Sequence, residues 1–151
     1  MNTLELRALL VRHDNTRKIF QDVYAADQLP LVKITKPRWL LIYNCCPINL
    51  PGLHWVAIFG NEKGEIEFFD SFGLPPNMYE GVQEFLKGQR PNSVIYNHRQ
   101  LQSTKSDACG HYCLFFSHYR SKGVRMEKIV EFIENFERDT WIKLQVLKEL
   151  Y

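Results

Sequence analysis

The stretch "LHWVAIFGNEKGEIEFFDSF", residues 53–72, decides the fold. Two apolar runs, "LHWVAIFG" and "EIEFFDSF", flank the short polar segment "NEKG". Aromatic and β-branched residues favour strands, and a short connection containing glycine favours an antiparallel hairpin. Such a hairpin pairs Phe59 or Gly60 with residues near 65, so it brings His54 and Asp70 together across the opposite ends of its strands.

Further strands are predicted on both sides of this hairpin. "RWLLIYNC" (38–45) precedes it and "SVIYN" (93–97) follows it, and both are rich in strand-forming residues. "LPLVKITKP" (29–37) is interrupted by prolines, so we expect an extended segment, at most an edge strand. The predicted strands therefore cluster in the middle of the chain.

Helices are predicted at both ends and between the strands. Asn2 with Glu5 resembles a capping box ahead of an apolar-periodic run, and Asp139 or Thr140 is the expected cap of the last helix. The expected helices cover 3–13, a short segment after Asn15, 77–88 with Asn77 as cap, 109–123 ended by Gly123, 125–136 and 139–151. The prediction is an α+β domain with a central mixed, mostly antiparallel sheet flanked by helices.

Composition limits the class of protein. With 151 residues, 45% hydrophobic and 24% charged, the chain suffices for one domain, residues 1–151, with its own core. A formal charge of +2 with scattered basic residues neither favours nor excludes nucleic-acid binding. No apolar run approaches the roughly eighteen residues of a membrane span, and the first residues do not resemble a signal peptide, so we expect a soluble, non-secreted protein in a reducing compartment.

The four cysteines are therefore expected to be thiols. Cys45 and Cys46 are adjacent and unsuited to pairing with each other; core thiols are the default interpretation, and a redox role is the alternative.

The segment "SDACGHYC" (106–113) has three interpretations. Cys109 and Cys113, four residues apart, supply only half of a zinc site, and His111 and His118 fall on other helix faces. Buried core thiols are the more common case, and the apolar residues after Cys113 fit it.

Cys109 fits the core interpretation less well. It lies where a polar loop becomes a helix, and the N-terminus of a helix lowers a thiol pKa. Gly110 removes a side chain that would hinder approach to the sulfur. The third interpretation is therefore a nucleophile.

A nucleophile needs a base that is oriented by a third group. His54 and Asp70 are candidates, although a lone histidine is often structural and an aspartate before "SFG" is often a turn residue. The Gln102 side-chain amide, with the backbone N–H of Cys109, can stabilise an oxyanion, and Gln100 is a nearby competitor.

The order of "HW" (54–55), "FFDSFG" and "LQSTKSDACGHYC" is similar to that of a clan of cysteine proteases. This clan includes the adenovirus maturation protease, adenain, and the SUMO- and ubiquitin-like-protein-specific proteases. Over residues 27–123 the chain most resembles the adenain-like proteases of adenovirus-related viruses and of Maverick/Polinton transposons or adintoviruses. Adenain has Glu at the position of Asp70, so here the chain is similar to the SUMO-protease branch and the transposon relatives.

The resemblance implies roles for individual residues. Cys109 matches the nucleophile, His54 the general base, Asp70 the residue that orients it, and Gln102 the oxyanion-hole amide. No metal or organic cofactor is implied.

The resemblance also implies a substrate class. Trp55 matches a tryptophan that confines a glycine-rich substrate tail in a tunnel, with Trp39 as a candidate for the other wall and Gly110 beside the nucleophile. Core or surface-groove packing is an equal alternative for Trp39. Only small residues fit such a tunnel, so cleavage after Gly-Gly or Gly-X-Gly is expected.

The implied function is an endopeptidase that processes viral or transposon structural precursors, in the virion and the host nucleus. Adenain is stimulated by a disulfide-linked viral peptide and by DNA, but the cysteine that receives the peptide has no clear counterpart here. One alternative function is an isopeptidase that removes ubiquitin-like modifiers. A non-catalytic binding module of the same fold is the other.

Overall fold

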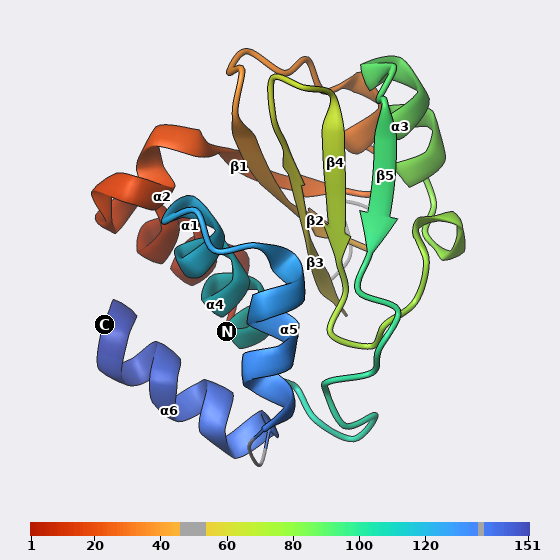
Figure 1. Ribbon diagram of the computed structural model, residues 1–151. Helices are drawn as coiled ribbons and strands as arrows, with labels where there is room; N and C mark the ends of the chain where they lie inside the picture. Colours follow the sequence, from red (N-terminus) through yellow and green to blue (C-terminus); the bar gives the residue numbers. More distant parts are fainter. Residues whose placement is uncertain (46–53, 136–137) are drawn as a thin grey trace.

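The computed structural model describes residues 1–45, 54–135 and 138–151. Within them one five-stranded sheet has its strands in chain order, β1-β2-β3-β4-β5 (Figure 1). The strands are β1 (Phe20–Ala25), β2 (Trp39–Asn44), β3 (Trp55–Gly60), β4 (Glu65–Phe69) and β5 (Ser93–Tyr96). The helices are α1 (Thr3–Arg12), α2 (Asp14–Ile19), α3 (Val82–Gln89), α4 (Cys109–Ser121), α5 (Met126–Glu134) and α6 (Arg138–Leu150), with 3₁₀ turns η1 (Leu29–Leu31) and η2 (Pro76–Met78).

The predicted hairpin forms the centre of the sheet. β3 and β4 pair antiparallel, and Gly60 faces Ile66 as expected. Asn61 Oδ1 accepts hydrogen bonds from the backbone N–H groups of Lys63 and Glu65, at 3.0 and 3.2 Å, which fixes the turn. The local signal was sufficient because strands and turn are adjacent in sequence.

The sheet is mixed, as predicted, but antiparallel pairs do not predominate. β2 pairs antiparallel with β3 and β3 with β4, whereas β1–β2 and β4–β5 are parallel. A parallel pair needs a crossover connection, and α3 lies in the crossover between β4 and β5.

The first edge strand differs from the prediction. The segment 29–37 forms η1 followed by irregular structure, and the edge strand is β1 instead. Pro30 occupies the first turn of η1, where its lack of an N–H costs no hydrogen bond. A register shift between Phe20 and Val23 breaks the alternation of buried residues in β1, so the sequence pattern did not reveal the strand.

The predicted start of α1 agrees with the structure, and the predicted start of α3 does not. The Asn2–Glu5 capping box is present, with both hydrogen bonds formed at 2.9 to 3.0 Å. Asn77 lies in η2 and does not cap α3, whose N-cap is Gly81 at φ 79°. There a Cβ would meet the carbonyl oxygen of Ala26 at 2.7 Å, so tertiary packing selects the glycine.

The last two helices also differ in detail from the prediction. α6 already includes Arg138, so Asp139 and Thr140 lie within the helix and do not cap it. The expected end of the preceding helix at residue 136 lies outside the described residues.

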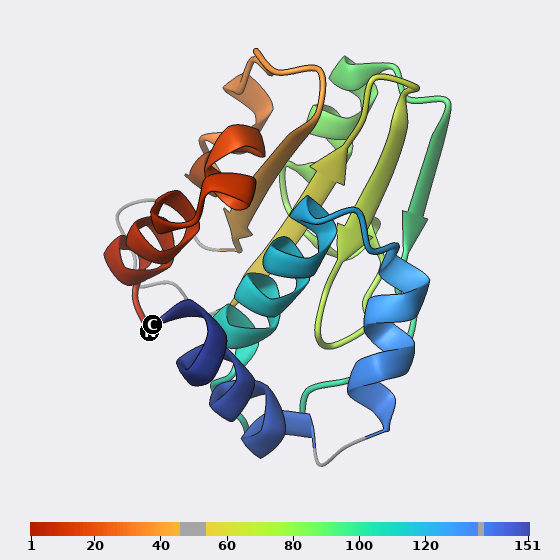
Figure 2. The same cartoon turned by 60° about the vertical axis from the view of Figure 1, so that its left-hand side comes forward.

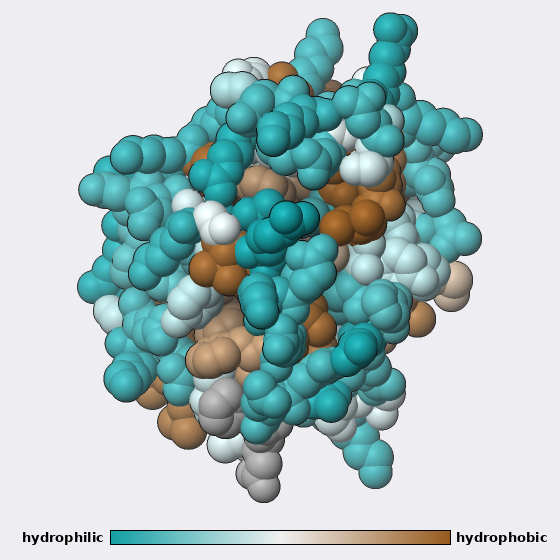
Figure 3. Space-filling view, in the orientation of Figure 1, coloured by the Kyte–Doolittle hydropathy of each residue, from teal (hydrophilic) through white to brown (hydrophobic). Residues whose placement is uncertain are grey.

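The helices form layers on both faces of the sheet (Figures 1 and 2). α1, α2, α4, α5 and α6 pack on one face and α3 packs on the other, so two hydrophobic clusters result. Along β2, Leu40 and Ile42 face the first cluster, and Leu41 and Tyr43 face the second. Hydrophilic side chains cover most of the face drawn in Figure 3. Among the described residues, no helix has the length and apolar character needed to span a membrane.

Candidate active site

Cys109 is the first residue of α4 and is 4% exposed. The helix follows the polar loop 98–108 and packs against the sheet, where the rings of Phe69 and Phe116 stack at 4.5 Å. The first backbone N–H groups of an α-helix have no partners within the helix, so the start of α4 is suited to a negative charge. The predicted position of Cys109 at a helix N-terminus is confirmed.

His54 and Asp70 come together at the ends of β3 and β4. His54 directly precedes β3, its carbonyl oxygen accepts a hydrogen bond from the N–H of Cys45, and Asp70 directly follows β4. His54 Nε2 and Asp70 Oδ1 are 2.7 Å apart, and both side chains are buried. Phe72 stacks on the His54 ring at a centroid distance of 4.5 Å, which fixes the plane of the imidazole.

The second ring nitrogen of His54, Nδ1, is not bound to Asp70. Nδ1 is buried and has no hydrogen-bond partner among the described residues. The Cys109 thiol is nevertheless close enough to the ring to change the pKa of His54. Burial lowers the pKa of His54, but Asp70 and Cys109 outweigh this effect and raise that pKa to about 9. The imidazole therefore favours its protonated form at neutral pH.

The Cys109 thiol has the opposite tendency. Burial raises its pKa, yet His54 and the backbone N–H groups of Trp55 and Gly110 outweigh this and hold the pKa below its ordinary value. Cys109 and His54 thus have the electrostatic character of a thiolate–imidazolium pair, which is the reactive form of a cysteine nucleophile.

Gln102 is held in a fixed orientation and is 1% exposed. Its Oε1 accepts a hydrogen bond from the Ser71 hydroxyl at 2.6 Å, and its Nε2 donates to the carbonyl oxygen of Ser106 at 2.8 Å. A primary amide has two N–H groups, so one remains for a further acceptor. Gln100, the competing candidate, is exposed, and its amide donates to the Gln102 carbonyl oxygen.

The Asp70 carboxylate is held by donors that sequence reasoning did not find. Oδ1 also accepts from the Phe72 N–H at 2.9 Å, and Oδ2 accepts from the Tyr79 hydroxyl at 2.5 Å and the Leu74 N–H at 3.3 Å. The Asn97 side chain bonds to both the N–H and the C=O of Asp70, at 2.9 and 2.7 Å. Tyr79 lies nine residues after Asp70 and Asn97 lies 27 residues after it, and no known local spacing pairs either residue with Asp70.

Gly73 brings two loops of the site into close contact. Its φ is 73°, and a Cβ would lie 2.6 to 2.8 Å from backbone atoms of Arg99 and Gln100. Only glycine allows the turn after Asp70 to approach the segment that leads to Gln102 so closely.

The two tryptophans lie in different parts of the molecule. Trp55 belongs to the same hydrophobic cluster as Cys109, beside the candidate site. Trp39 faces the other cluster, contacts Phe85 edge to face at 5.7 Å and pairs with Gly60, at the far end of β3. Five residues of strand correspond to about 17 Å. The prediction that Trp39 forms the second wall of a substrate tunnel at Cys109 is wrong, because the strand register separates it from the site.

Gly110 lies against Met1. A Cβ on Gly110 would meet Met1 Sδ at 2.9 Å, so the glycine makes room for this side chain next to Cys109. The expected role of Gly110 in leaving space for substrate stays a prediction.

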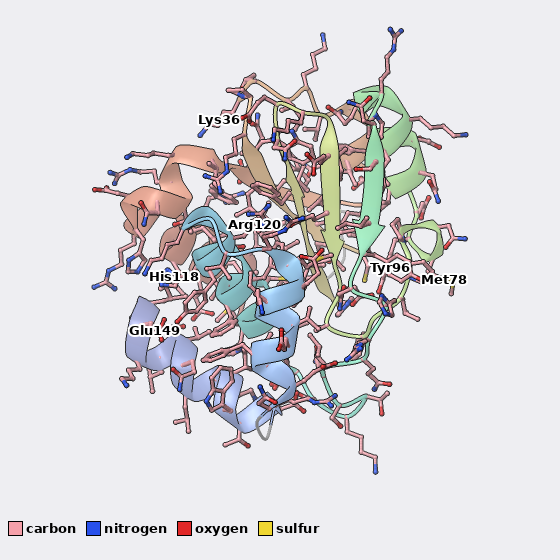
Figure 4. The ribbon with its side chains drawn as sticks, in the orientation of Figure 1. Lys36, Met78, Tyr96, His118, Arg120 and Glu149 are labelled. Carbon is pink, nitrogen blue, oxygen red and sulfur yellow. The ribbon has the colours of Figure 1, made fainter. Side chains whose placement is uncertain are left out.

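The other candidate ligands do not gather into a metal site within the described part of the chain. No group of three or more His, Cys, Asp or Glu side chains is arranged there to hold a metal ion. Cys113 is 1% exposed, as the core interpretation predicts, and His118 lies beside Glu149 of α6 at 3.6 Å (Figure 4). Cys45 is half-buried, and Cys46 lies outside the described residues.

Within the described residues, the Cys109 thiol, the His54 imidazole and the Asp70 carboxylate form one connected group, and the Gln102 amide is tied to Ser71, the residue after Asp70. These groups together are suited to nucleophilic attack on an acyl carbon with stabilisation of the oxyanion that forms.

Comparison with known proteins identifies a matching family and a relative. Residues 33–147 match the Ulp1 protease family, C-terminal catalytic domain. A protein of Acanthamoeba polyphaga mimivirus that is named as a thiol protease is 26% identical in an alignment of 152 residues, gaps included. The alignment covers 86% of this chain and 50% of that protein. The chain thus spans about half the length of this relative.

Two solved structures share the fold. The central domain of the uncharacterized protein Lpg1148 from Legionella pneumophila is 15% identical with a TM-score of 0.53, over 99% of this chain and 96% of that one. HopZ1a, solved in complex with IP6 and CoA, is 18% identical with a TM-score of 0.51, over 82% of this chain and 44% of that one. At these identities the likeness concerns the fold alone.

Proposed function

The chain belongs to the Ulp1 protease family, and from this premise we propose that it is a cysteine endopeptidase with Cys109 as its nucleophile. The observation that carries the proposal is the placement of His54 between Asp70 and Cys109. Asp70 and Cys109 raise the pKa of His54 to about 9 while His54 lowers that of Cys109. Shifts in these opposite directions stabilise the thiolate of Cys109 and the imidazolium of His54 relative to the same groups free in solution.

The reaction begins when the Cys109 thiolate attacks the carbonyl carbon of the scissile peptide bond. The oxyanion accepts hydrogen bonds from the second N–H of Gln102 Nε2 and from the backbone N–H of Cys109. His54 then donates its proton to the amide nitrogen, the C–N bond breaks, and a thioester remains.

Hydrolysis completes the cycle. The neutral His54 takes a proton from water, the resulting hydroxide attacks the thioester, and the C–S bond breaks, so the thiolate re-forms beside the imidazolium. The product leaves as a carboxylic acid, which loses its proton to solvent. Asp70 keeps Nε2 of His54 hydrogen-bonded at 2.7 Å, so Nδ1 is the nitrogen that exchanges protons with sulfur and substrate. These steps use the side chains of Cys109, His54, Asp70 and Gln102, the backbone N–H of Cys109 and water.

The proposed substrates are polypeptides cut after glycine, at Gly-Gly or Gly-X-Gly sites in viral or transposon structural precursors. The relation to a mimivirus protein named as a thiol protease supports a viral setting, including action within the virion. Trp55, next to the base and in the same cluster as Cys109, is the proposed confining side chain.

The test is cleavage of fluorogenic peptides that differ in the residues before the scissile bond, with the reduced chain. We expect cleavage after glycine that Cys109→Ala abolishes and Cys113→Ala leaves intact. Cys113 is a matched control because it lies one helical turn further along α4 in the core. Equal cleavage by Cys109→Ala would overturn the proposal.

A second candidate is removal of ubiquitin-like modifiers, which the Ulp1 family match favours. It is distinguished by offering SUMO-type and ubiquitin-type conjugates alongside the peptides. Cleavage of conjugates at much higher kcat/KM than of any peptide would favour the isopeptidase, and cleavage of glycine-containing peptides alone would favour the endopeptidase.

A further inference from the structure

We propose that Tyr79 is a positioning residue of this site, which acts through Asp70 to keep His54 in its working orientation. The proposal rests on the proposed function, because it assigns Tyr79 to the Cys109–His54–Asp70 arrangement. Tyr79 lies in the segment between η2 and α3, nine residues after Asp70, and its own hydroxyl reaches back to that carboxylate.

The contact is strong by its geometry. The Tyr79 hydroxyl donates to Asp70 Oδ2 at 2.5 Å, whereas the other donor to Oδ2, the Leu74 N–H, is at 3.3 Å. Hydrogen bonds from O–H groups to carboxylates are among the stronger ones in proteins. Tyr79 is therefore the main partner of Oδ2, and Oδ1 is left to His54 and the Phe72 N–H.

The Tyr79 ring is itself fixed. It contacts Tyr43 edge to face and Phe68 at a tilt, each with centroids 5.9 Å apart, and lies nearly parallel to the His54 ring at 6.1 Å. Tyr43 in turn donates its hydroxyl to the Glu80 carbonyl oxygen at 2.8 Å. The hydroxyl of Tyr79 is thus held in place by the second hydrophobic cluster, on the face of the sheet opposite Cys109.

The orientation of the Asp70 carboxylate depends on the different partners of its two oxygens. A carboxylate can rotate about its Cβ–Cγ bond, and a buried one adopts the rotamer that satisfies both oxygens. With Tyr79 bound to Oδ2, Oδ1 faces Nε2 of His54. Burial and then Asp70 raise the pKa of Tyr79, so the hydroxyl stays protonated and remains a donor throughout the working range of pH.

The test is the variant Tyr79→Phe, which removes the hydroxyl and keeps the ring. The measurement is the rate of Cys109 alkylation by iodoacetamide as a function of pH, followed on the peptide that contains Cys109. We expect an alkylation rate about tenfold lower near neutral pH and an inflection at higher pH, because a misaligned Asp70 supports the imidazolium less well. With peptide substrate, kcat should fall while KM stays within twofold, since Tyr79 acts through Asp70.

The matched control is Tyr119→Phe. Tyr119 also donates its hydroxyl to a carboxylate, that of Glu149 at 2.7 Å, but near the other end of α4. An alkylation profile of Tyr79→Phe that coincides with that of Tyr119→Phe would overturn the proposal. In an Asp70→Asn background, Tyr79→Phe should have no further effect, and an undiminished second effect would also overturn it.

If the chain is not a protease, the same experiments give a result that differs from a failure of the Tyr79 proposal. A wild-type chain that cuts no peptide, and whose Cys109 reacts no faster than in the unfolded chain, would refute the protease assignment. Nuclear magnetic resonance of His54 in the same variants would still report on Tyr79. A lower imidazole pKa in Tyr79→Phe supports the positioning role, and an unchanged titration refutes it.

Discussion

At the scale of single residues, the site depends on the balance between burial and a few charged contacts. Burial alone would favour a neutral thiol on Cys109 and a neutral imidazole on His54. Asp70 and Cys109 reverse the balance for His54, and His54 with the backbone N–H groups of Trp55 and Gly110 reverses it for Cys109. The buried Asp70 carboxylate acts on His54 directly and on Cys109 only through His54.

This balance predicts a bell-shaped dependence of kcat/KM on pH. The thiolate–imidazolium pair exists only above the pKa of Cys109 and below that of His54, which is raised from its ordinary 6.5 to about 9. Activity should thus fall as pH rises through about 9. In Asp70→Asn this limb should move to lower pH, and a limb that stays in place would contradict the assigned role of Asp70.

A second prediction concerns Gln102. Gln102→Ala removes the proposed oxyanion donor, so kcat should fall by about 10²- to 10³-fold with little change in KM. Gln100→Ala is the control, because Gln100 is exposed and its amide bonds to the backbone carbonyl oxygen of Gln102 and not to the Gln102 side chain. Steady-state kinetics of both variants decide which glutamine acts, and equal losses would argue against Gln102.

At the scale of elements, the site is assembled where β3, β4 and α4 meet two loops. The turn after β4 supplies Asp70, and the segment after β5 supplies Asn97 and Gln102. Gly73 allows the backbones of these two segments to touch. The relative placement of carboxylate and amide therefore depends on this close approach together with the hydrogen bonds of Ser71 to Gln102 and of Asn97 to Asp70.

Gly73→Ala should accordingly reduce both stability and activity. The added Cβ meets backbone atoms and the left-handed φ is strained, so we expect a loss of about 2 kcal/mol in the free energy of unfolding. Gly88→Ala is the control, because nothing lies within 4 Å of its Cβ and it is inside α3. Urea unfolding with peptide kinetics measures both effects; a Gly73→Ala variant as stable and active as Gly88→Ala would refute this account.

At the scale of the whole molecule, α4 is tied to the sheet by charge as well as by packing. Arg120 is labelled in Figure 4. Its Nε lies 2.7 Å from Glu67 Oε1, both side chains are largely buried, and the guanidinium lies over the Phe59 ring at 4.2 Å. Arg38 donates to the Arg120 carbonyl oxygen at 2.8 Å. The helix that carries Cys109 is thus fixed to the sheet at its far end.

Arg120→Ala should destabilise the molecule strongly. It leaves Glu67 buried without its partner, a change that costs about 3 kcal/mol or more in the free energy of unfolding. Arg17→Ala, at an exposed pair with Asp14, should cost less than about 1 kcal/mol. Denaturant unfolding of the two variants compares them directly, and equal losses would show that the buried pair contributes no more than a surface one.

The sequence by itself determined the features that depend on neighbouring residues. The hairpin that brings His54 to Asp70 follows from two apolar runs and a short turn, and the start of α4 at Cys109 follows from a change from polar to apolar periodicity. These signals are local, because strand pairing across a tight turn and helix initiation involve residues close in the chain.

Only the tertiary structure decided the rest. The parallel edge strands, the hydrogen bonds of Asn97 to the Asp70 backbone and the close approach at Gly73 join segments distant in sequence. The separation of Trp39 from the site and the hydrogen bond from Tyr79 to the Asp70 carboxylate also depend on tertiary packing. Which side chains meet there depends on strand register and on the packing of two cores against one sheet. A shift of one residue in register would exchange the two faces, so no local pattern specifies these contacts.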